Sequence, residues 1–152
     1  MKTTTILSIF QNALHAYNQM CEPILKQFDI SQVSFDILMF LNNNPQYTTA
    51  QEISQVRNIK KNLVSVHVEK LVCAGLLERG SIAGDRRKVS LSCTEKAEPI
   101  IKAGLAMQKT FHDTLTQGVS KEQWNVYREV IETMDANAKL IASQHNSEVS
   151  DT

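Results

Sequence analysis

Basic side chains are concentrated in one stretch of a chain that is neutral as a whole. The 152 residues carry 16 Lys and Arg against 16 Asp and Glu. Between Arg57 and Lys88, however, eight basic residues accompany only three acidic ones, which gives this segment a net charge of +5. Clustered lysine and arginine can neutralise the phosphates of a nucleic acid. The alternative interpretation of such a cluster is a solvated charged face that binds no partner.

Several residues in this stretch are of types that read DNA bases. Asn62 can hydrogen-bond adenine, Val66 can contact the methyl group of thymine, and Ser65 can bind a base or a phosphate. Lysines at the start of the same predicted helix are suited to phosphates. The predicted DNA contacts are Lys60, Lys61, Asn62, Ser65, Val66, His67, Lys70, Arg86 and Arg87.

Two short helices joined by a tight turn are predicted to position these residues. A capping box at Thr49–Glu52 opens the first helix, and residues 57–59 form the turn. The second helix is expected from about Lys61 to Ala74. Its apolar residues recur at gaps of four and three, so they share the face that packs against the core. These anchors are Val64, Val68 and Leu71.

A basic hairpin is predicted to follow the second helix. Short alternating strands are expected at 76–79 and 88–91. The loop between them holds Arg86 and Arg87, which can reach an adjacent minor groove or its phosphates. Two helices with a basic hairpin behind them predict a winged helix-turn-helix DNA-binding domain over residues 31–94.

The flanking segments are predicted to be long amphipathic helices. Apolar residues recur at helical spacing from Ile6 to Phe28, and Pro23 is expected to kink or restart that helix. Thr94 is expected to cap a further helix, and a second capping box at residues 120–123 opens the last one. The predicted fold class is mainly α with a small β-hairpin wing.

Apolar stripes on the flanking helices indicate a homodimer. Long stripes at both ends of a small domain are easier to bury between two subunits than within one, although a monomer core is the other interpretation. Residues 1–30 and 95–145 are accordingly predicted to be dimerisation helices, and residues 146–152 a flexible tail. A dimer also suits a palindromic DNA operator, because its two reading helices are related by a two-fold axis.

Cysteine and histidine residues show no pattern that predicts catalysis or metal binding. The three cysteines are odd in number and far apart, which argues against a disulfide framework. Cys73 is predicted to point outward, and Cys93 precedes a helix start that can lower a thiol pKa, so both are candidate redox thiols; inert packing is the simpler interpretation. His67 flanks the buried stripe and is either a core-edge residue or a phosphate contact.

Other classes of protein find little support in the sequence. No motif indicates an enzyme, and no metal or cofactor is predicted. The apolar runs are too short to span a bilayer, which favours a cytoplasmic protein.

The centre of the chain resembles the multiple antibiotic resistance regulator (MarR) family of bacterial transcription factors. The most specific matches are the junction from Leu71 to Arg79, the wing Asp85-Arg86-Arg87, and Thr94-Glu95-Lys96 after it. The resemblance implies a homodimer, a helix at 61–74 that enters the major groove, and a wing in which Asp85 braces Arg87. The chain departs from the family pattern at Ala97, where glycine is common, and at Val66, where polar or basic residues are common.

The sequence therefore predicts a dimeric, sequence-specific DNA-binding transcriptional regulator. The resemblance implies a repressor that a small-molecule effector relieves. An effector pocket is expected between the dimerisation helices and the DNA-binding domain, lined by aromatic residues that are more often plain core. These residues are Phe10, Tyr17, Phe35 and Phe111. Two alternatives stay open: a thiol-based redox-responsive regulator, and a winged-helix protein-interaction adaptor that does not bind DNA.

Overall fold

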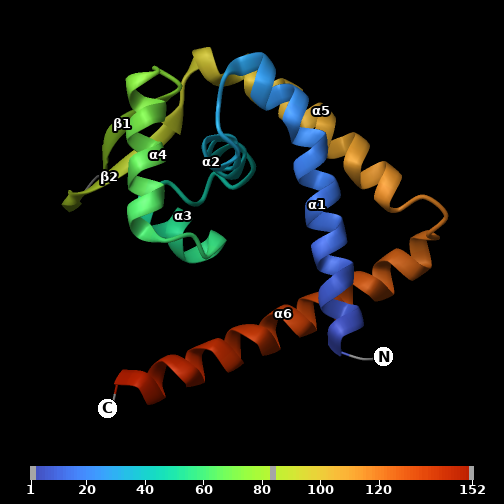
Figure 1. Cartoon of the computed structure of the whole chain (residues 1–152). Helices are drawn as coiled ribbons and strands as arrows, with labels where there is room; N and C mark the ends of the chain where they lie inside the picture. The colour runs from blue at the N-terminus through green and yellow to red at the C-terminus, as the bar shows by residue number, and fades with distance from the viewer. Residues whose placement is uncertain (1–2, 83–84, 151–152) are drawn as a thin grey trace. The chain divides into compact units, whose positions relative to one another are not determined.

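The computed structural model describes residues 3–82 and 85–150, with side chains for residues 7–81 and 89–141. The chain divides into two compact units, Met1–Leu115 and Thr116–Thr152. The second unit contains α6 (Lys121–Ser150). The first contains a mainly helical array with one antiparallel hairpin, as Figure 1 shows, and the predicted fold class is confirmed. Its elements are α1 (Thr3–Phe28), α2 (Gln32–Asn43), α3 (Ala50–Arg57), α4 (Lys61–Cys73), β1 (Leu77–Ile82), β2 (Asp85–Cys93) and α5 (Glu98–Leu115).

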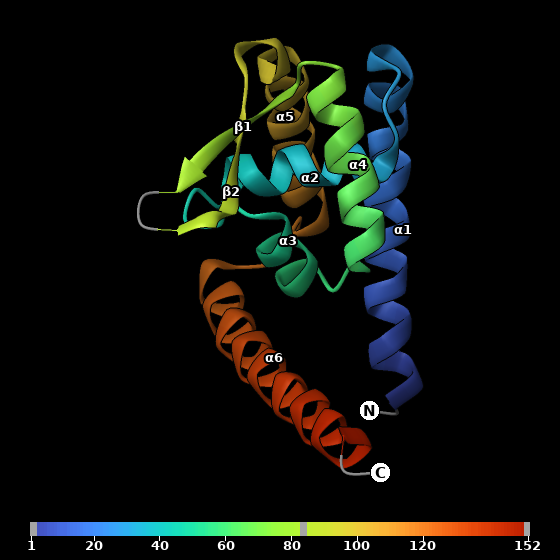
Figure 2. The same ribbon diagram turned by 90° about the vertical axis from the view of Figure 1, so that its left-hand side faces the viewer.

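Helix α2 is the centre of the first unit. Its residues from Phe35 to Leu41 are buried except for Asp36, as expected of a helix enclosed by other elements. It contacts α1, α4, α5 and β2, and Figure 2 shows it lying between α4 and α5. Ser31 caps its start, since the Ser31 side chain accepts a hydrogen bond from the Ser34 amide at 3.2 Å. A helix enclosed in this way fixes α4 relative to α1 and α5.

The helix-turn-helix forms as the sequence predicts. Thr49 Oγ1 accepts a hydrogen bond from the Glu52 amide at 3.2 Å, and Glu52 Oε2 accepts one from the Thr49 amide at 2.8 Å. These two bonds complete the predicted capping box at the start of α3. Asn58 ends α3 in the left-handed conformation, with φ at 51°. All three predicted anchors of α4 are buried, namely Val64, Val68 and Leu71.

The hairpin β1–β2 is longer than the predicted strands at 76–79 and 88–91. Leu77 and Cys93 pair at its base, and the pairing continues without a break to Ser81. Apolar alternation marks only the part of a hairpin that packs on a core, whereas backbone hydrogen bonds extend the ladder beyond it. The sequence pattern therefore predicts the position of the wing but not the length of its strands.

The entry to α5 differs from the prediction. Thr94 does not cap this helix, because its hydroxyl donates to the Gly75 carbonyl at 2.7 Å. A short 3₁₀ turn, Glu95–Ala97, precedes the helix, and Pro99 occupies its first turn. Gly75 ends α4 in the left-handed conformation, with φ at 70°, as predicted. The Gly75 carbonyl at this helix end therefore accepts the hydrogen bond from the Thr94 hydroxyl.

The two long outer helices are more continuous than the sequence predicts. Helix α1 runs through Pro23 as a single helix. Helix α6 extends to Ser150, so the predicted flexible tail 146–152 is helical as far as that residue; no Gly or Pro stops it. The capping box at its start is confirmed by the bond from the Gln123 amide to Ser120 Oγ at 3.2 Å. Among the described residues, no helix is both long and apolar enough to cross a membrane.

Candidate nucleic-acid interface

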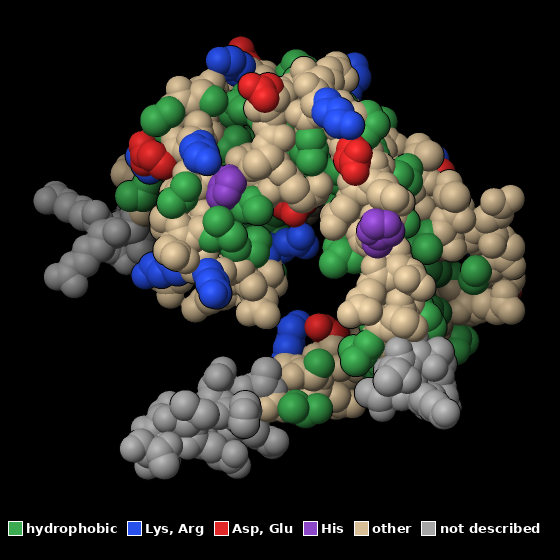
Figure 3. Space-filling view, viewed as in Figure 1, with side chains coloured by type: hydrophobic (Ala, Val, Ile, Leu, Met, Phe, Trp, Pro, Cys, Tyr) green, Lys and Arg blue, Asp and Glu red, His purple; other side chains and the backbone are tan. Residues whose placement is uncertain are grey.

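Helix α4 has one face in the core and one in solvent. The side chains on its inner face are Val64, His67, Val68 and Leu71. Its exposed side chains, called the outer face, are those of Lys61, Asn62, Leu63, Ser65, Val66, Glu69, Lys70 and Cys73. Figure 3 shows Lys and Arg side chains at the end of α4 that adjoins α3. A helix backed by a core and exposed along its length has the width that fits a DNA major groove.

The polar residues predicted to bind DNA lie at the start of this outer face. Lys60 and Lys61 are exposed where the helix begins. Asn62 Oδ1 accepts a hydrogen bond from the Leu63 amide at 2.9 Å, which orients the side-chain amide. Ser65 Oγ donates to the Lys61 carbonyl at 2.9 Å. With its hydrogen directed inward, this hydroxyl offers a partner only its oxygen.

Two further predicted contacts continue the outer face along the helix. Val66 is 50% exposed, which leaves its methyl groups open to an apolar partner. Lys70 lies one turn further on and is also exposed. The outer face therefore places an apolar contact between groups suited to phosphates.

His67 has to be moved from the predicted DNA contacts to the core. Its side chain is 8% exposed, and its Nδ1 lies 3.0 Å from Ser34 Oγ and 3.2 Å from Ser31 Oγ. Burial, and then the charge of Lys70, lower the pKa of His67. The helical spacing could not decide between core edge and outer face, because the serine partners lie more than 30 residues away in sequence.

An ion pair that the sequence does not reveal joins the outer face to the wing. Arg79 of β1 donates to Glu69 Oε2 at 2.6 Å, and the Cys73 thiol lies 3.5 Å from Glu69 Oε1. The hydrogen bond from Arg79 lowers the pKa of Glu69, followed by that from Cys73. Glu69 is the one acidic residue on the outer face, so Arg79 neutralises the charge that would repel a phosphate.

The wing tip lies only partly within the described residues. The backbone of β2 begins at Asp85, but the side chains of residues 82–88 lie outside the described part. The predicted contacts of Arg86 and Arg87, and the predicted bracing by Asp85, therefore stay predictions.

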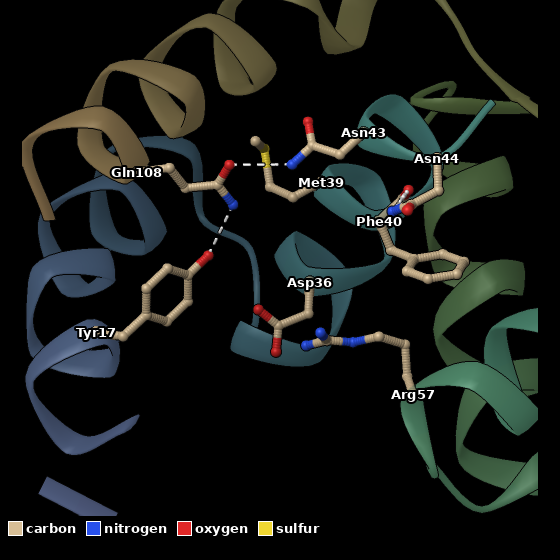
Figure 4. A pocket seen from close by; sticks show the side chains of 8 residues that line it. All are labelled: Tyr17, Asp36, Met39, Phe40, Asn43, Asn44, Arg57 and Gln108. Carbon is tan, nitrogen blue, oxygen red and sulfur yellow. Dashed lines mark hydrogen bonds between the residues drawn. The ribbon is translucent and has the colours of Figure 1, made fainter. Parts of the chain in front are cut away.

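A cavity of about 90 Å³ lies among α1, α2, α3 and α5 of the first unit (Figure 4). Of the four aromatic residues predicted to line an effector pocket, Tyr17 is among its lining residues. Phe111 packs edge-on against Tyr17, with ring centroids 5.3 Å apart. Phe35 is fully buried in the core, and Phe10 is 45% exposed on α1. The cavity is lined by Tyr17, Asp36, Met39, Phe40, Asn43, Asn44, Arg57 and Gln108.

Polar groups that the sequence analysis missed dominate this cavity. Gln108 Nε2 donates to Tyr17 Oη at 3.0 Å, and Asn43 Nδ2 donates to Gln108 Oε1 at 3.0 Å, so these bonds link α5 with α1 and α2. Asp36 and Arg57 point toward one another across the cavity in Figure 4. Burial raises the pKa of Asp36, while a hydrogen bond from Gln32 and the charge of Arg57 oppose the rise. Single polar residues on separate helices leave no local sequence pattern.

The two candidate thiols lie in different surroundings. Cys73 is exposed on the outer face of α4. Cys93 is half-buried, and burial raises the pKa of its thiol, so the lowering expected from a helix start is wrong. The described residues contain no group of three or more His, Cys, Asp or Glu that could hold a metal ion.

Comparison with known proteins agrees with this geometry. Residues 28–88 match the MarR family. The fold is similar to that of the transcriptional regulator PA3341, with a TM-score of 0.78 and 21% identity over 91% of this chain and 98% of that one. The fold is also similar to that of a MarR protein from Peptoclostridium difficile, with a TM-score of 0.76 and 19% identity over 91% of this chain and 90% of that one. For the S. aureus MepR–DNA complex, the TM-score is 0.71 and the identity 19%, over 90% of this chain and 98% of that one.

The family match covers the helix-turn-helix and most of the wing, where the sequence resemblance is also most specific. The matched family is one of transcriptional regulators, in agreement with the expectation that the chain is not an enzyme. Residues 28–88 of the chain match the MarR family, and the fold is that of the winged helix-turn-helix transcriptional regulators compared above.

Proposed function

We propose that the chain is a homodimeric, sequence-specific repressor that a small-molecule effector releases from its operator. The observation that carries this proposal is the outer face of α4. Groups suited to base edges lie there between lysines suited to phosphates, on a helix whose opposite face is buried. MepR, which has a similar fold, has been solved as a complex with DNA.

Each exposed group of α4 has a distinct role in this proposal. Lys60 and Lys61 bind phosphates beside the groove, and Asn62 binds an adenine edge. Val66 packs on a thymine methyl group. Ser65 accepts a hydrogen bond from a base amino group, because its own hydrogen is directed to the Lys61 carbonyl. A phosphate oxygen, which only accepts, is a poor partner for that oxygen.

The wing supplies the second part of the proposed contact. The hairpin extends away from α2 and α4 in Figure 2, so its tip can reach beyond the groove that α4 occupies. We assign Arg86 and Arg87 to the adjacent minor groove or its phosphates, with Asp85 bracing Arg87. The ion pair between Glu69 and Arg79 links this hairpin to α4.

Exposed apolar side chains support a homodimer. On α1, Leu7 and Leu14 are 56% and 61% exposed, and on α6, Val126 and Val130 are 61% and 50% exposed. Such side chains gain most when a second apolar surface covers them. A second copy of the chain supplies that surface on both helices and places two reading helices on one palindrome.

The polar cavity is the proposed effector site. Its lining comes from α1, α2, α3 and α5, so a ligand there contacts both the helix-turn-helix and its flanking helices. Arg57 and Asp36 offer opposite charges, and Tyr17 and Gln108 offer hydrogen bonds. The volume of about 90 Å³ suits a small polar molecule unless the helices separate. Separation of the helices is how a larger effector would change the position of α3 and α4.

Selection of DNA by the purified chain tests the proposed function. Duplexes enriched from a random-sequence library at moderate salt should share a palindrome, and footprinting should show two protected half-sites about one helical turn apart. Enrichment of single half-sites without a palindrome would contradict the dimer. Absence of any enriched sequence would contradict DNA reading and favour the adaptor. The paired charge of Glu69 already weighs against an adaptor with an acidic recognition surface.

A thiol-responsive regulator is a second candidate function, because Cys73 is exposed on the outer face of α4. Peroxide would oxidise the Cys73 thiol to a sulfenic acid with release of water, which adds an oxygen atom at the surface proposed to enter the groove and is reversed by a thiol reductant. The same footprint repeated with peroxide and then with reductant tests this candidate. Loss and recovery of protection in the wild-type chain, but not in Cys73→Ser, would support it, and an unchanged footprint would remove it.

A further inference from the structure

Helix α4 carries a buried titratable group that the proposed DNA contact does not use. His67 lies on its inner face, and its Nδ1 is 3.0 Å from Ser34 Oγ and 3.2 Å from Ser31 Oγ. Ser31 caps α2 and Ser34 lies in its first turn. This His67 cluster, made of His67, Ser31 and Ser34, therefore joins the proposed reading helix to the start of the central helix.

The hydrogen bonds of the cluster have a direction. The Ser31 oxygen accepts from the Ser34 amide at 3.2 Å, and its hydroxyl donates to Ser34 Oγ at 3.0 Å. We assign the Ser34 hydroxyl as the donor to His67 Nδ1, which places the ring hydrogen on Nε2. An imidazolium has a hydrogen on both nitrogens and accepts nothing. In this arrangement of hydrogens the ring is neutral, and protonation at Nδ1 would displace the Ser34 hydroxyl hydrogen from it.

Positive charge at this position is disfavoured by the surroundings as well. On α4 the neighbouring charge is Lys70, and the facing part of α2 is its N-terminus, which is the positive end of the helix dipole. Asp29 lines the adjacent cavity together with Lys70 and both serines, but no carboxylate shifts the His67 pKa, nor does any charged group of α3 or β1. Burial and Lys70 lower that pKa.

We propose that neutral His67 is a positioning residue, which holds α4 on the start of α2 in the orientation that reads DNA, and that its protonation loosens this contact and weakens DNA binding in acid. The proposal rests on the assignment of α4 as the reading helix. Ser65 and Val66 directly precede His67 in α4, so movement of the helix changes how they approach the bases.

The sign of the pH dependence follows from the lowered pKa. A histidine whose pKa is lower in the folded protein than its ordinary value near 6.5 stabilises the fold fully above that value. The contribution is lost as the pH falls through the lower, folded value. DNA binding should therefore be constant above about pH 7 and fall in acid.

Substitution of His67→Asn separates titration from hydrogen bonding. The asparagine amide places a polar atom near the position of Nδ1 but cannot be protonated. The probe is a duplex selected by the wild-type chain at about pH 7.5. Between about pH 7.5 and pH 5, wild-type affinity should fall roughly tenfold, the size expected when a buried hydrogen bond is lost. H67N should bind as the wild type does at the upper pH and stay within about twofold of it at the lower one.

Two further variants control for general effects of acid. His15 is exposed on α1, outside the cluster, so H15N should keep the wild-type pH profile. Ser34→Ala removes the donor to Nδ1 without removing the titrating group, so it should weaken binding already at about pH 7.5. Circular dichroism at each pH confirms that the variants are folded.

The outcomes separate this inference from the proposed function. Parallel pH profiles of the wild type and H67N would overturn the inference alone. So would an NMR titration in which His67 shows a pKa at or above its ordinary value, or in which its protonation leaves the amide signals of α4 unmoved. If the wild type binds no duplex at about pH 7.5, the proposed function and this inference fall together.

Discussion

The outer face of α4 and the apolar side chains of α6 are both exposed, but their chemistry is opposite. On α4, lysines and amide or hydroxyl groups surround the half-exposed Val66. On α6, Val126, Val130 and Ile141 are 50–69% exposed. The first surface suits a polar, negatively charged partner, whereas the second suits another apolar surface. Under the proposed function, the chain therefore takes part in two association reactions of different physical origin, DNA binding and dimerisation.

The salt dependence of the association constants should distinguish DNA binding from dimerisation more clearly than any substitution. Phosphate binding by lysine and arginine releases counterions, so DNA affinity should fall roughly thousandfold or more between about 50 and 200 mM salt if six or more phosphates are neutralised. Apolar association has no such dependence, and salt leaves it unchanged or strengthens it. Anisotropy with a selected duplex and sedimentation of the free chain measure the two constants. Equal salt slopes for both would break the comparison.

A charge placed on α6 should disrupt the apolar reaction and, through it, the polar one. Val130→Glu should make the chain monomeric in sedimentation, because a carboxylate cannot be buried unpaired in an apolar interface. Affinity for a palindromic duplex should fall by about a hundredfold or more, since the second half-site no longer binds intramolecularly. Asn125→Glu adds the same charge at a polar exposed position of α6 and serves as the matched control. A monomer that retained wild-type DNA affinity would contradict the dimeric function.

Local periodicity explains why so much of the helix-turn-helix could be predicted from the sequence. The anchors Val64, Val68 and Leu71 repeat every three or four residues, so their burial follows from the pattern of a single helix. The capping box at Thr49–Glu52 is likewise confined to four residues. Interactions that close within one turn of helix leave a signature that needs no knowledge of the fold.

Interactions between distant segments left no such signature. His67 fits the edge of either face of α4, and only the approach of Ser31 and Ser34 decides that it is core. The cavity residue Gln108 binds Tyr17, 91 positions away, so a search for aromatic residues found one member of the lining and missed its polar partners. Prediction of these sites requires the relative placement of helices, which packing determines and periodicity does not.

Within the polar surface, base readers and phosphate binders should respond differently. Asn62→Ala should remove about 1–3 kcal/mol of preference at one base pair, which repeated selection would show as a relaxed position in the palindrome. Lys61→Ala should weaken all sequences about equally and make the salt slope shallower by roughly one unit per half-site contact. Loss of preference in the lysine variant, or uniform weakening in the asparagine variant, would reverse these two assignments.

The smallest expected effect on DNA affinity comes from Glu69, the acidic residue on the outer face of α4. The hydrogen bond from Arg79 lowers the pKa of Glu69, and the pair as a whole is neutral. Arg79→Gln should therefore lower DNA affinity a few-fold, because it leaves a carboxylate facing the phosphates, and Glu69→Gln should raise it by a similar factor. Both side chains are exposed, so the stability of the fold should change little.

The double variant decides whether charge alone connects these two residues. If Arg79 serves only to neutralise Glu69, then R79Q combined with E69Q should restore affinity to near that of the wild type, and the effect of each single change should shrink as salt rises. If Arg79 also fixes the wing against α4, the double variant should stay weak at every salt concentration. Anisotropy titrations of the four proteins distinguish the two cases, and with them whether the wing and α4 act as one rigid reading surface or as two surfaces joined by charge.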